Sequence, residues 1–183
     1  TAKAVATLDR LSKGRMILGI GSGWLEEEFD ALGVSFERRG DRTDEYLQAM
    51  RAAWSDDRAS FHGDFINFSD VYSRPQPVDR HVPIIVGGHS KRAARRAGQF
   101  GDGFFPGRGR PEELAELFDH ARRSAEECGR DPASLEFTAG GPTTPEFVEQ
   151  LAAIGVSRMI VPPMEPSHFA KFGDEVITEF SSF

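Results

Sequence analysis

Short apolar runs alternate with amphipathic stretches along most of the chain. The first run, Met16, Ile17 and Leu18, has the continuous apolar character of a strand buried on both faces. Similar runs recur at intervals that leave room for a helix between them. The pattern predicts five strands, at residues 16–20, 82–86, 102–105, 135–139 and 158–161.

The stretches between these runs carry apolar residues at helical spacing, as Val5, Leu8 and Leu11 do before the stop signal of Gly14. Thr144 and the proline after it mark a further helix start. Helices are predicted at residues 2–11, 42–54, 90–97, 111–128, 145–154 and 169–180, with a helical turn beginning at residue 26. Strands that alternate with helices in this way predict parallel βα units and an α/β fold.

One stretch departs from this rhythm. Residues 59–68 alternate apolar and polar positions around a His-Gly-Asp turn, which predicts a β-hairpin inserted into the main fold. Residues 72–81 contain two prolines and are expected to form an extended connector.

Composition narrows the classes of function. The chain has 183 residues, 39% of them hydrophobic, and a net charge of −7. This length suits one domain with its own core, and the acidic balance argues against nucleic-acid and anionic-membrane partners, which select clustered Lys and Arg. Cys128 is the single cysteine, so we expect no internal disulfide. No apolar run approaches the roughly 20 residues of a membrane span, and a cytoplasmic location is expected.

Glycines cluster where the first predicted strand ends. Gly19, Gly21 and Gly23 lack a Cβ atom, so a flat or charged ligand can approach the main chain there, and they reach φ angles closed to other residues. The segment is therefore either a ledge for a ligand or only a tight turn from strand to helix.

A second glycine corner follows the strand at residues 82–86. Gly87 and Gly88 lead through a histidine into Ser90, Lys91 and Arg92, where a helix is predicted to begin. One interpretation is a phosphate site, because this segment combines free backbone amides, a hydroxyl group, a helix dipole and two cations. The plainer interpretation is that Ser90 is an N-cap and that the two cations are solvated. The carboxyl ends of parallel strands lie on the same side of the fold. Both glycine segments and the end of the 102–105 strand are therefore expected to line one ligand site.

Other residues near the strand ends allow two interpretations each. Trp24 and Phe105 either flank a planar ring or belong to the core. The glutamates at residues 26–28 either supply an acid or base or complement a helix dipole. The five histidines lack paired metal-ligand spacing and no G-x-S-x-G motif occurs, so we expect neither a metal centre nor a serine nucleophile.

Three stretches within residues 2–106 match a known family: VATLDRLSKGRMILGIGSGWLEEEFDALGVSFERRGDRTDEYLQAMRAAW, SFHGDFINF and PIIVGGHSKRAARRAGQFGDGFFP. On these motifs the chain resembles the luciferase-like flavin and deazaflavin oxidoreductases, which fold as a (β/α)8 TIM barrel with an inserted excursion. The branch it most resembles uses coenzyme F-420, a deazaflavin. The resemblance implies a cofactor site with Gly21, Ser22 and Gly23 near the ring and Val86, Gly87, Gly88, His89 and Ser90 near the phosphate-bearing tail. Trp24, which follows the first glycine segment, is added to the predicted site as an aromatic residue that could flank the ring.

The resemblance covers only part of a barrel. A full TIM barrel takes about 250 residues, and the first residues here resemble the helix after the family's third strand. The expectation is one domain at residues 1–183, a partial barrel of strands four to eight that lacks the first three βα units. No catalytic acid or base is assigned, because in the family the missing units supply it. Unpaired first and last strands would leave exposed edges, so a homo-oligomer is expected.

The resemblance implies an oxidoreductase that transfers a hydride between reduced coenzyme F-420 and a small organic substrate. An FMN-dependent luciferase-like monooxygenase, which shares the same motifs, is the close alternative. A Rossmann-type methyltransferase would need an acidic residue at the end of a second strand about 20 residues after the glycines, and residues 33–42 offer no such strand. A non-catalytic remnant of the scaffold is the fourth possibility.

Overall fold

The computed structural model describes residues 1–163 and 165–178, and its centre is a five-stranded parallel sheet. The strand order is β1-β4-β5-β6-β7, and each neighbouring pair is parallel. Sequence order and spatial order therefore agree without reversal. This confirms the predicted partial barrel and contradicts the doubly wound sheet of a Rossmann-type domain. The strands are β1 (Leu18–Ile20), β4 (Ile84–Gly87), β5 (Gly103–Phe105), β6 (Glu136–Gly140) and β7 (Val156–Ile160).

The first strand is shorter and more exposed than the sequence predicts. It begins at Leu18, and Ile17 is 42% exposed. Leu18 and Ile20 are only partly buried and Gly19 is exposed, so the expected burial on both faces is wrong; within the described residues β1 is an edge strand that pairs only with β4. At the opposite edge, β7 begins at Val156, earlier than predicted, and Ile160 is 49% exposed.

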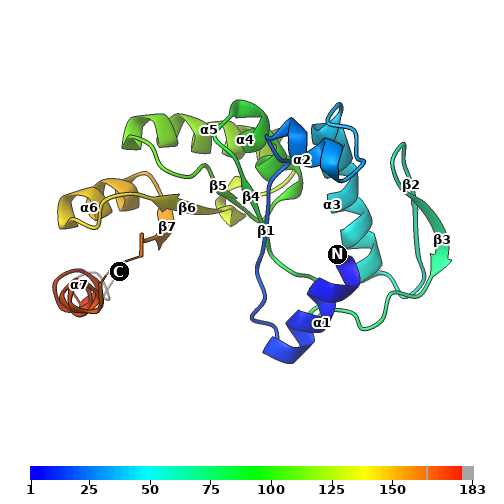
Figure 1. Ribbon diagram of the computed structural model, residues 1–183, viewed down its shortest axis with the longest axis horizontal. Coiled ribbons are helices and arrows are strands. Elements are labelled where there is room, and N and C mark those ends of the chain that lie inside the picture. Colours follow the sequence, from blue (N-terminus) through cyan, green and yellow to red (C-terminus); the bar gives the residue numbers. More distant parts are fainter. Residues whose placement is uncertain (164, 179–183) are drawn as a thin grey trace.

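Helices occupy the predicted intervals, and α4 and α5 cover one face of the sheet (Figure 1). No helix in the described part of the chain is long and apolar enough to span a membrane. The last predicted helix is divided into α7 and a π-helical segment, and its remainder at residues 179–180 lies outside the described residues. The helical elements are α1 (Ala2–Ser12), α2 (Glu26–Ala31), α3 (Arg39–Ser55), α4 (Lys91–Phe100), α5 (Pro111–Glu127), η1 (Pro132–Ser134), α6 (Pro145–Ala153), α7 (Pro166–Phe172) and η2 (Gly173–Ile177).

The predicted hairpin is confirmed as a separate two-stranded antiparallel sheet of β2 (Ala59–His62) and β3 (Asn67–Val71). It lies beside α3, away from the main sheet (Figure 1). Its turn is fixed by Glu45 of α3, whose carboxylate accepts hydrogen bonds from the amides of Phe65 and Ile66, both at 2.7 Å. A Cβ atom at Gly63 would collide with this carboxylate, so the turn requires glycine there.

Helix α5 starts with a charged cap. The Glu113 carboxylate accepts hydrogen bonds from the Arg110 guanidinium at 2.6 and 3.0 Å and from the Arg110 amide at 3.4 Å. The side-chain hydrogen bond is the largest of the effects that lower the pKa of Glu113 below its ordinary value. Helix α6 lacks such a cap: Thr144 precedes it as predicted, but its side chain makes no capping hydrogen bond.

Aromatic packing fills the space between the sheet and α5. The rings of Phe118 and Phe137 are 4.3 Å apart between centroids, and Phe104 meets Phe118 edge-on at 6.2 Å. Phe104 and Phe118 are fully buried. At Gly98 of α4, an added Cβ atom would collide with the Ala121 backbone, so the two helices approach closely there. This packing holds α4 firmly against α5 above the strand ends.

The carboxylate of Asp102, just before β5, joins three elements. Its Oδ2 accepts hydrogen bonds from the Ile84 amide at 2.8 Å and from the Arg51 guanidinium of α3 at 2.9 Å. The Asp102 amide in turn donates to the Ile84 carbonyl at 2.7 Å, and its carbonyl accepts from Glu136 at 3.0 Å. One residue therefore fixes the starting register of β4, β5 and β6 and ties α3 to them.

Replacing this carboxylate is expected to destabilise the fold. Asp102→Asn keeps the volume but weakens two charge-assisted hydrogen bonds, and we expect the free energy of unfolding to fall by about 1–3 kcal/mol. Urea unfolding followed by circular dichroism measures this. The control is Asp57→Asn, which removes exposed ion pairs with Arg74 and Arg80 and is expected to change stability by less than about 1 kcal/mol. Equal effects of the two variants would contradict the role given to Asp102.

Candidate functional site

The two predicted glycine segments follow the carboxyl ends of two neighbouring strands. Strands β1 and β4 pair in parallel with Ile20 opposite Val86, so Gly21 and Gly87 follow at neighbouring positions. An added Cβ atom at Gly87 would lie 3.3 Å from the Ile20 carbonyl oxygen, closer than side chains normally allow. Glycine at this position therefore lets the two strand ends come together.

A pocket of about 280 Å³ opens between these segments. Three arginines join its lining, Arg39 from α3 and Arg92 and Arg96 from α4, and the sequence analysis identified only Arg92. We call this the cofactor pocket. Six of the nine predicted site residues line it: Ser22, Gly23, Trp24, Gly87, Gly88 and Ser90.

The free backbone amides at this corner are not the ones the sequence suggested. Gly88 has a φ of +132°, and its amide donates to the Phe105 carbonyl at 3.2 Å, so it is not free. The correction follows from the sheet: β4 continues pairing with β5 through Gly87. The first intrahelical bond of α4 runs from Ala94 to Ser90, which leaves the amides of Lys91 and Arg92 ahead of it.

Ser90 is the N-cap of α4. Its hydroxyl oxygen accepts a hydrogen bond from the Ala93 amide at 3.2 Å, which confirms the plainer interpretation of this serine. The cap uses the oxygen as an acceptor, and the hydroxyl hydrogen can still be donated to a ligand. Capping and anion binding are therefore compatible at this residue.

Helix α4 begins with two cations. Its first turn contains Lys91 and Arg92 and no acidic residue, whereas the neighbouring α5 begins with Glu112 and Glu113, as the helix dipole favours. Arg39 adds a further cation, held by a hydrogen bond to the Gly23 carbonyl at 3.1 Å. Positive charge at a helix N-terminus suits an anion with several negative oxygens.

Three predicted site residues lie outside the cofactor pocket. Val86 is buried in the core, and the Nδ1 atom of His89 lies 3.0 Å from the Pro106 carbonyl oxygen, turned toward the loop after β5. Gly21 lines a separate apolar pocket of about 590 Å³, together with residues of α3 and the hairpin that sequence reasoning missed. These include Tyr46, Met50, Ile66 and Phe68.

The structure also shows where the other residues singled out near the strand ends lie. Trp24 is 81% exposed, so it is not a core residue. Phe105 is partly buried at the end of β5, opposite Gly87. The glutamates at 26–28 are exposed in the first turn of α2 and do not line the cofactor pocket, in keeping with dipole complementation. Among the described residues, no group of three His, Cys, Asp or Glu side chains is arranged to hold a metal ion.

Comparison with known proteins gives the family. The luciferase-like monooxygenase family model matches residues 1–170, and the chain belongs to this family. This confirms the resemblance drawn from the sequence motifs.

Individual relatives show how much of a whole protein the chain represents. An uncharacterized protein of Mycobacterium tuberculosis is 34% identical over 161 residues, 87% of this chain and 55% of that protein. The FMNH(2)-dependent dimethylsulfone monooxygenase of Pseudomonas putida is 36% identical over 128 residues, 68% of this chain and 35% of that protein. The chain therefore spans about half the length of the first relative and about a third of the second.

A solved structure agrees on the fold. An F420-dependent secondary alcohol dehydrogenase, in complex with an F420-acetone adduct, superposes with a TM-score of 0.79 at 20% identity, over 97% of this chain and 72% of that one. At this identity the likeness concerns the fold alone.

The cap at Ser90 yields a stability prediction. We expect Ser90→Ala to lower the free energy of unfolding by about 0.5–2 kcal/mol, because the Ala93 amide loses its acceptor. The matched control is Thr144→Ala at the start of α6, where the side chain makes no capping bond, and little change is expected. Thermal unfolding of both variants checks this, and a larger loss for Thr144→Ala would contradict the assigned cap.

Proposed function

We propose that this chain holds coenzyme F-420 in an oxidoreductase that transfers a hydride between the reduced deazaflavin and a small organic substrate. The observation that carries the proposal is the cofactor pocket, where both glycine segments meet three arginines at the carboxyl ends of adjacent parallel strands. Family membership supports an oxidoreductase, and the resemblance of the glycine motifs to the branch that uses coenzyme F-420 supports the choice of deazaflavin.

The residues fit a ligand with a planar ring and a phosphate. The amides of Lys91 and Arg92, the Ser90 hydroxyl and the guanidinium of Arg92 would hold the phosphate. Gly21, where an added Cβ atom would meet nothing within 4 Å, would let the ring approach the main chain, and the apolar pocket that Gly21 lines would exclude water from it. When bound, F-420 supplies the hydride chemistry, and the protein supplies position and electrostatics.

FMN is the second candidate cofactor. The Pseudomonas putida relative is named an FMNH(2)-dependent monooxygenase, and its 36% identity to this chain is the observation in favour of FMN. FMN also combines a planar ring with a phosphate, so the same pocket would suit it. An FMN-dependent monooxygenase is therefore the alternative function.

Cofactor titration tests both proposals. Fluorescence titration of the full chain with F-420 and with FMN is expected to give tighter binding of F-420. In Gly88→Ala, the new methyl group would lie 3.0 Å from the Ala93 Cβ atom at a φ of +132°. This pushes the first turn of α4 out of place, and we expect the dissociation constant for F-420 to rise about ten-fold or more.

Gly129→Ala is the matched control. Gly129 also has a positive φ, +71°, but an added Cβ atom there has open space and the residue is outside the pocket. It also places alanine at a positive φ, but without a contact like that with Ala93, so F-420 affinity is expected to stay within roughly two-fold of the parent chain. Unchanged affinity in Gly88→Ala removes the phosphate assignment. Failure of both cofactors to bind favours a scaffold without catalysis.

We also propose that the chain associates with itself or with a further polypeptide. Within the described residues, β1 and β7 are edge strands; the exposed Ile17 directly precedes β1, and the exposed Ile160 is the last residue of β7. Apolar edges with unpaired backbone groups favour association. Light scattering is expected to give a mass above the 20.2 kDa of one chain, and Ile17→Lys with Ile160→Lys is expected to reduce it. A monomer for the parent chain would refute this proposal.

A further inference from the structure

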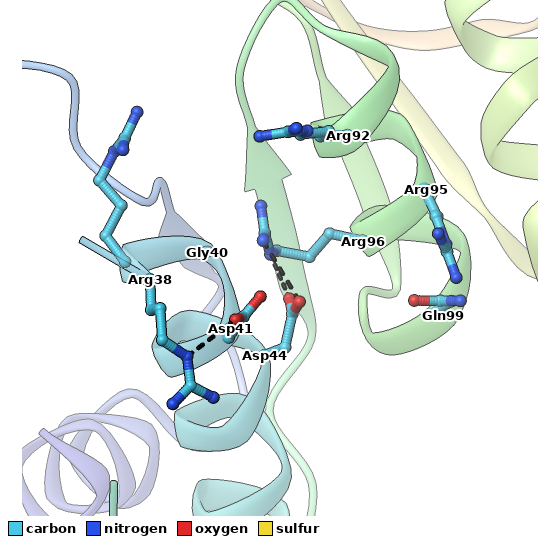
Figure 2. Close-up of a pocket in the computed structure, with 9 residues that line it drawn as sticks. Arg38, Gly40, Asp41, Asp44, Arg92, Arg95, Arg96 and Gln99 are labelled. Carbon is cyan, nitrogen blue, oxygen red and sulfur yellow. Dashed lines mark hydrogen bonds and ion pairs between the residues drawn. The ribbon is translucent and has the colours of Figure 1, made fainter. Parts of the chain in front are cut away.

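A second pocket, which we call the arginine pocket, lies between the start of α3 and helix α4 (Figure 2). Its volume is about 510 Å³. Five arginines and two aspartates give its lining a net charge of +3, although the chain as a whole carries −7. The charged residues are Arg38, Arg39, Asp41, Asp44, Arg92, Arg95 and Arg96.

The arginine pocket continues from the cofactor pocket. Arg39, Gly40, Arg92 and Arg96 line both, so the start of α4 borders both hollows. A ligand whose phosphate lies at Lys91 and Arg92 could therefore extend into the arginine pocket without leaving the protein surface.

Some of these cations already have partners. Arg96 is mostly buried and forms an ion pair with Asp44 across the two helices. Arg38 is hydrogen-bonded to Asp64 at 2.7 Å and to Asp41 at 3.2 Å, and these bonds raise its pKa above the ordinary value. Together these pairs form the wall of the pocket.

Arg92 and Arg95 are different, because neither side chain has a hydrogen bond or an ion pair to any described residue. Figure 2 shows Arg92 extending from α4 toward α3, with Arg95 beside Gln99. Arg92 lies three and four residues from Arg95 and Arg96, so the like charges repel along one helix face. Arg92 also lies in the first turn of α4, where the dipole disfavours cations. The arrangement costs stability that an anionic ligand would recover.

We propose that the arginine pocket binds carboxylate groups of an extended anion whose phosphate occupies the cofactor pocket. Guanidinium groups match carboxylates in shape and can bind them through two parallel hydrogen bonds. This inference rests on the proposed function and refines it. Coenzyme F-420 carries a chain of glutamates beyond its phosphate, whereas FMN ends at its phosphate, so the pocket would select the deazaflavin. A free oligocarboxylate offers the same carboxylate groups as the glutamate chain of F-420, and the experiment titrates these two ligands separately.

The test is Arg95→Gln, because Arg95 lines the arginine pocket but not the cofactor pocket. The full chain is titrated with F-420 that carries its glutamates and with the phosphate-bearing precursor that lacks them, and binding is read by fluorescence. We expect Arg95→Gln to weaken the glutamylated form by roughly three- to ten-fold and to leave the precursor unchanged. Equal effects on the two ligands, or no effect on either, overturn the proposal.

The matched control is Arg123→Gln. Arg123 is an exposed arginine of α5 on the other side of Arg95, outside the arginine pocket, and its variant has the same net charge. It is expected to bind both forms as the parent chain does. If it weakens the glutamylated form as much as Arg95→Gln does, general charge rather than the pocket is responsible, and the proposal fails. Thermal unfolding verifies that both variants remain folded.

A further titration distinguishes failure of the carboxylate-site proposal from failure of the proposed function. Tri-γ-glutamate alone is titrated by calorimetry into the parent chain and into Arg95→Gln. If FMN binds and neither deazaflavin does, the F-420 proposal fails, yet binding of the tripeptide that Arg95→Gln weakens still supports a carboxylate site. No binding of the tripeptide in that case overturns the pocket as well.

Discussion

The Asp102 carboxylate is the constraint on which the arrangement of the site depends. It accepts hydrogen bonds from the first amide of β4 and from Arg51 of α3, while its own backbone bonds to Ile84 and Glu136 set β5 beside β4 and β6. Parallel strands that start in register also end together, so this contact at one end of the sheet determines which loops meet at the other. The same contact holds α3 beside the sheet, and α3 delivers Arg39 and Asp44 to the pockets.

The strand ends could be predicted from the sequence because their signals are local. Apolar runs that stop at glycine identified β1 and β4, and the alternation of strands and helices fixed their parallel order, which brings Ser22 and Gly88 together. The exposure of β1 could not be predicted in this way, since an apolar run looks the same in a central strand and at an edge. The contribution of α3 was also missed. Arg39 reaches the pocket through tertiary packing, and nothing in its neighbouring sequence marks it as a ligand-binding residue.

The distribution of charge likewise depends on tertiary packing and not on composition alone. The net charge of −7 describes the whole surface, but the fold gathers cations from two separate helices around one hollow. The acidic first turns of α2 and α5 complement their dipoles, whereas the first turn of α4, which borders both pockets, carries Lys91 and Arg92. Average composition therefore argues against a basic surface for nucleic acid, and it gives no information about an anion site of the proposed size.

Ser90 shows why the structural and functional interpretations of a residue need not compete. Its oxygen accepts the Ala93 hydrogen bond, and this fixes the first turn of α4 so that the amides of Lys91 and Arg92 point past the helix end. Without that cap the turn would fray, and the amides would lose the common direction that an anion requires. The capping bond is thus a condition for the proposed anion binding at this corner. Gly88 contributes in the same way: its φ of +132° turns the chain from β4 into α4, and its lack of a Cβ atom keeps the space at Ala93 clear. The local geometry that stabilises the start of α4 is the same geometry that the proposed phosphate site requires.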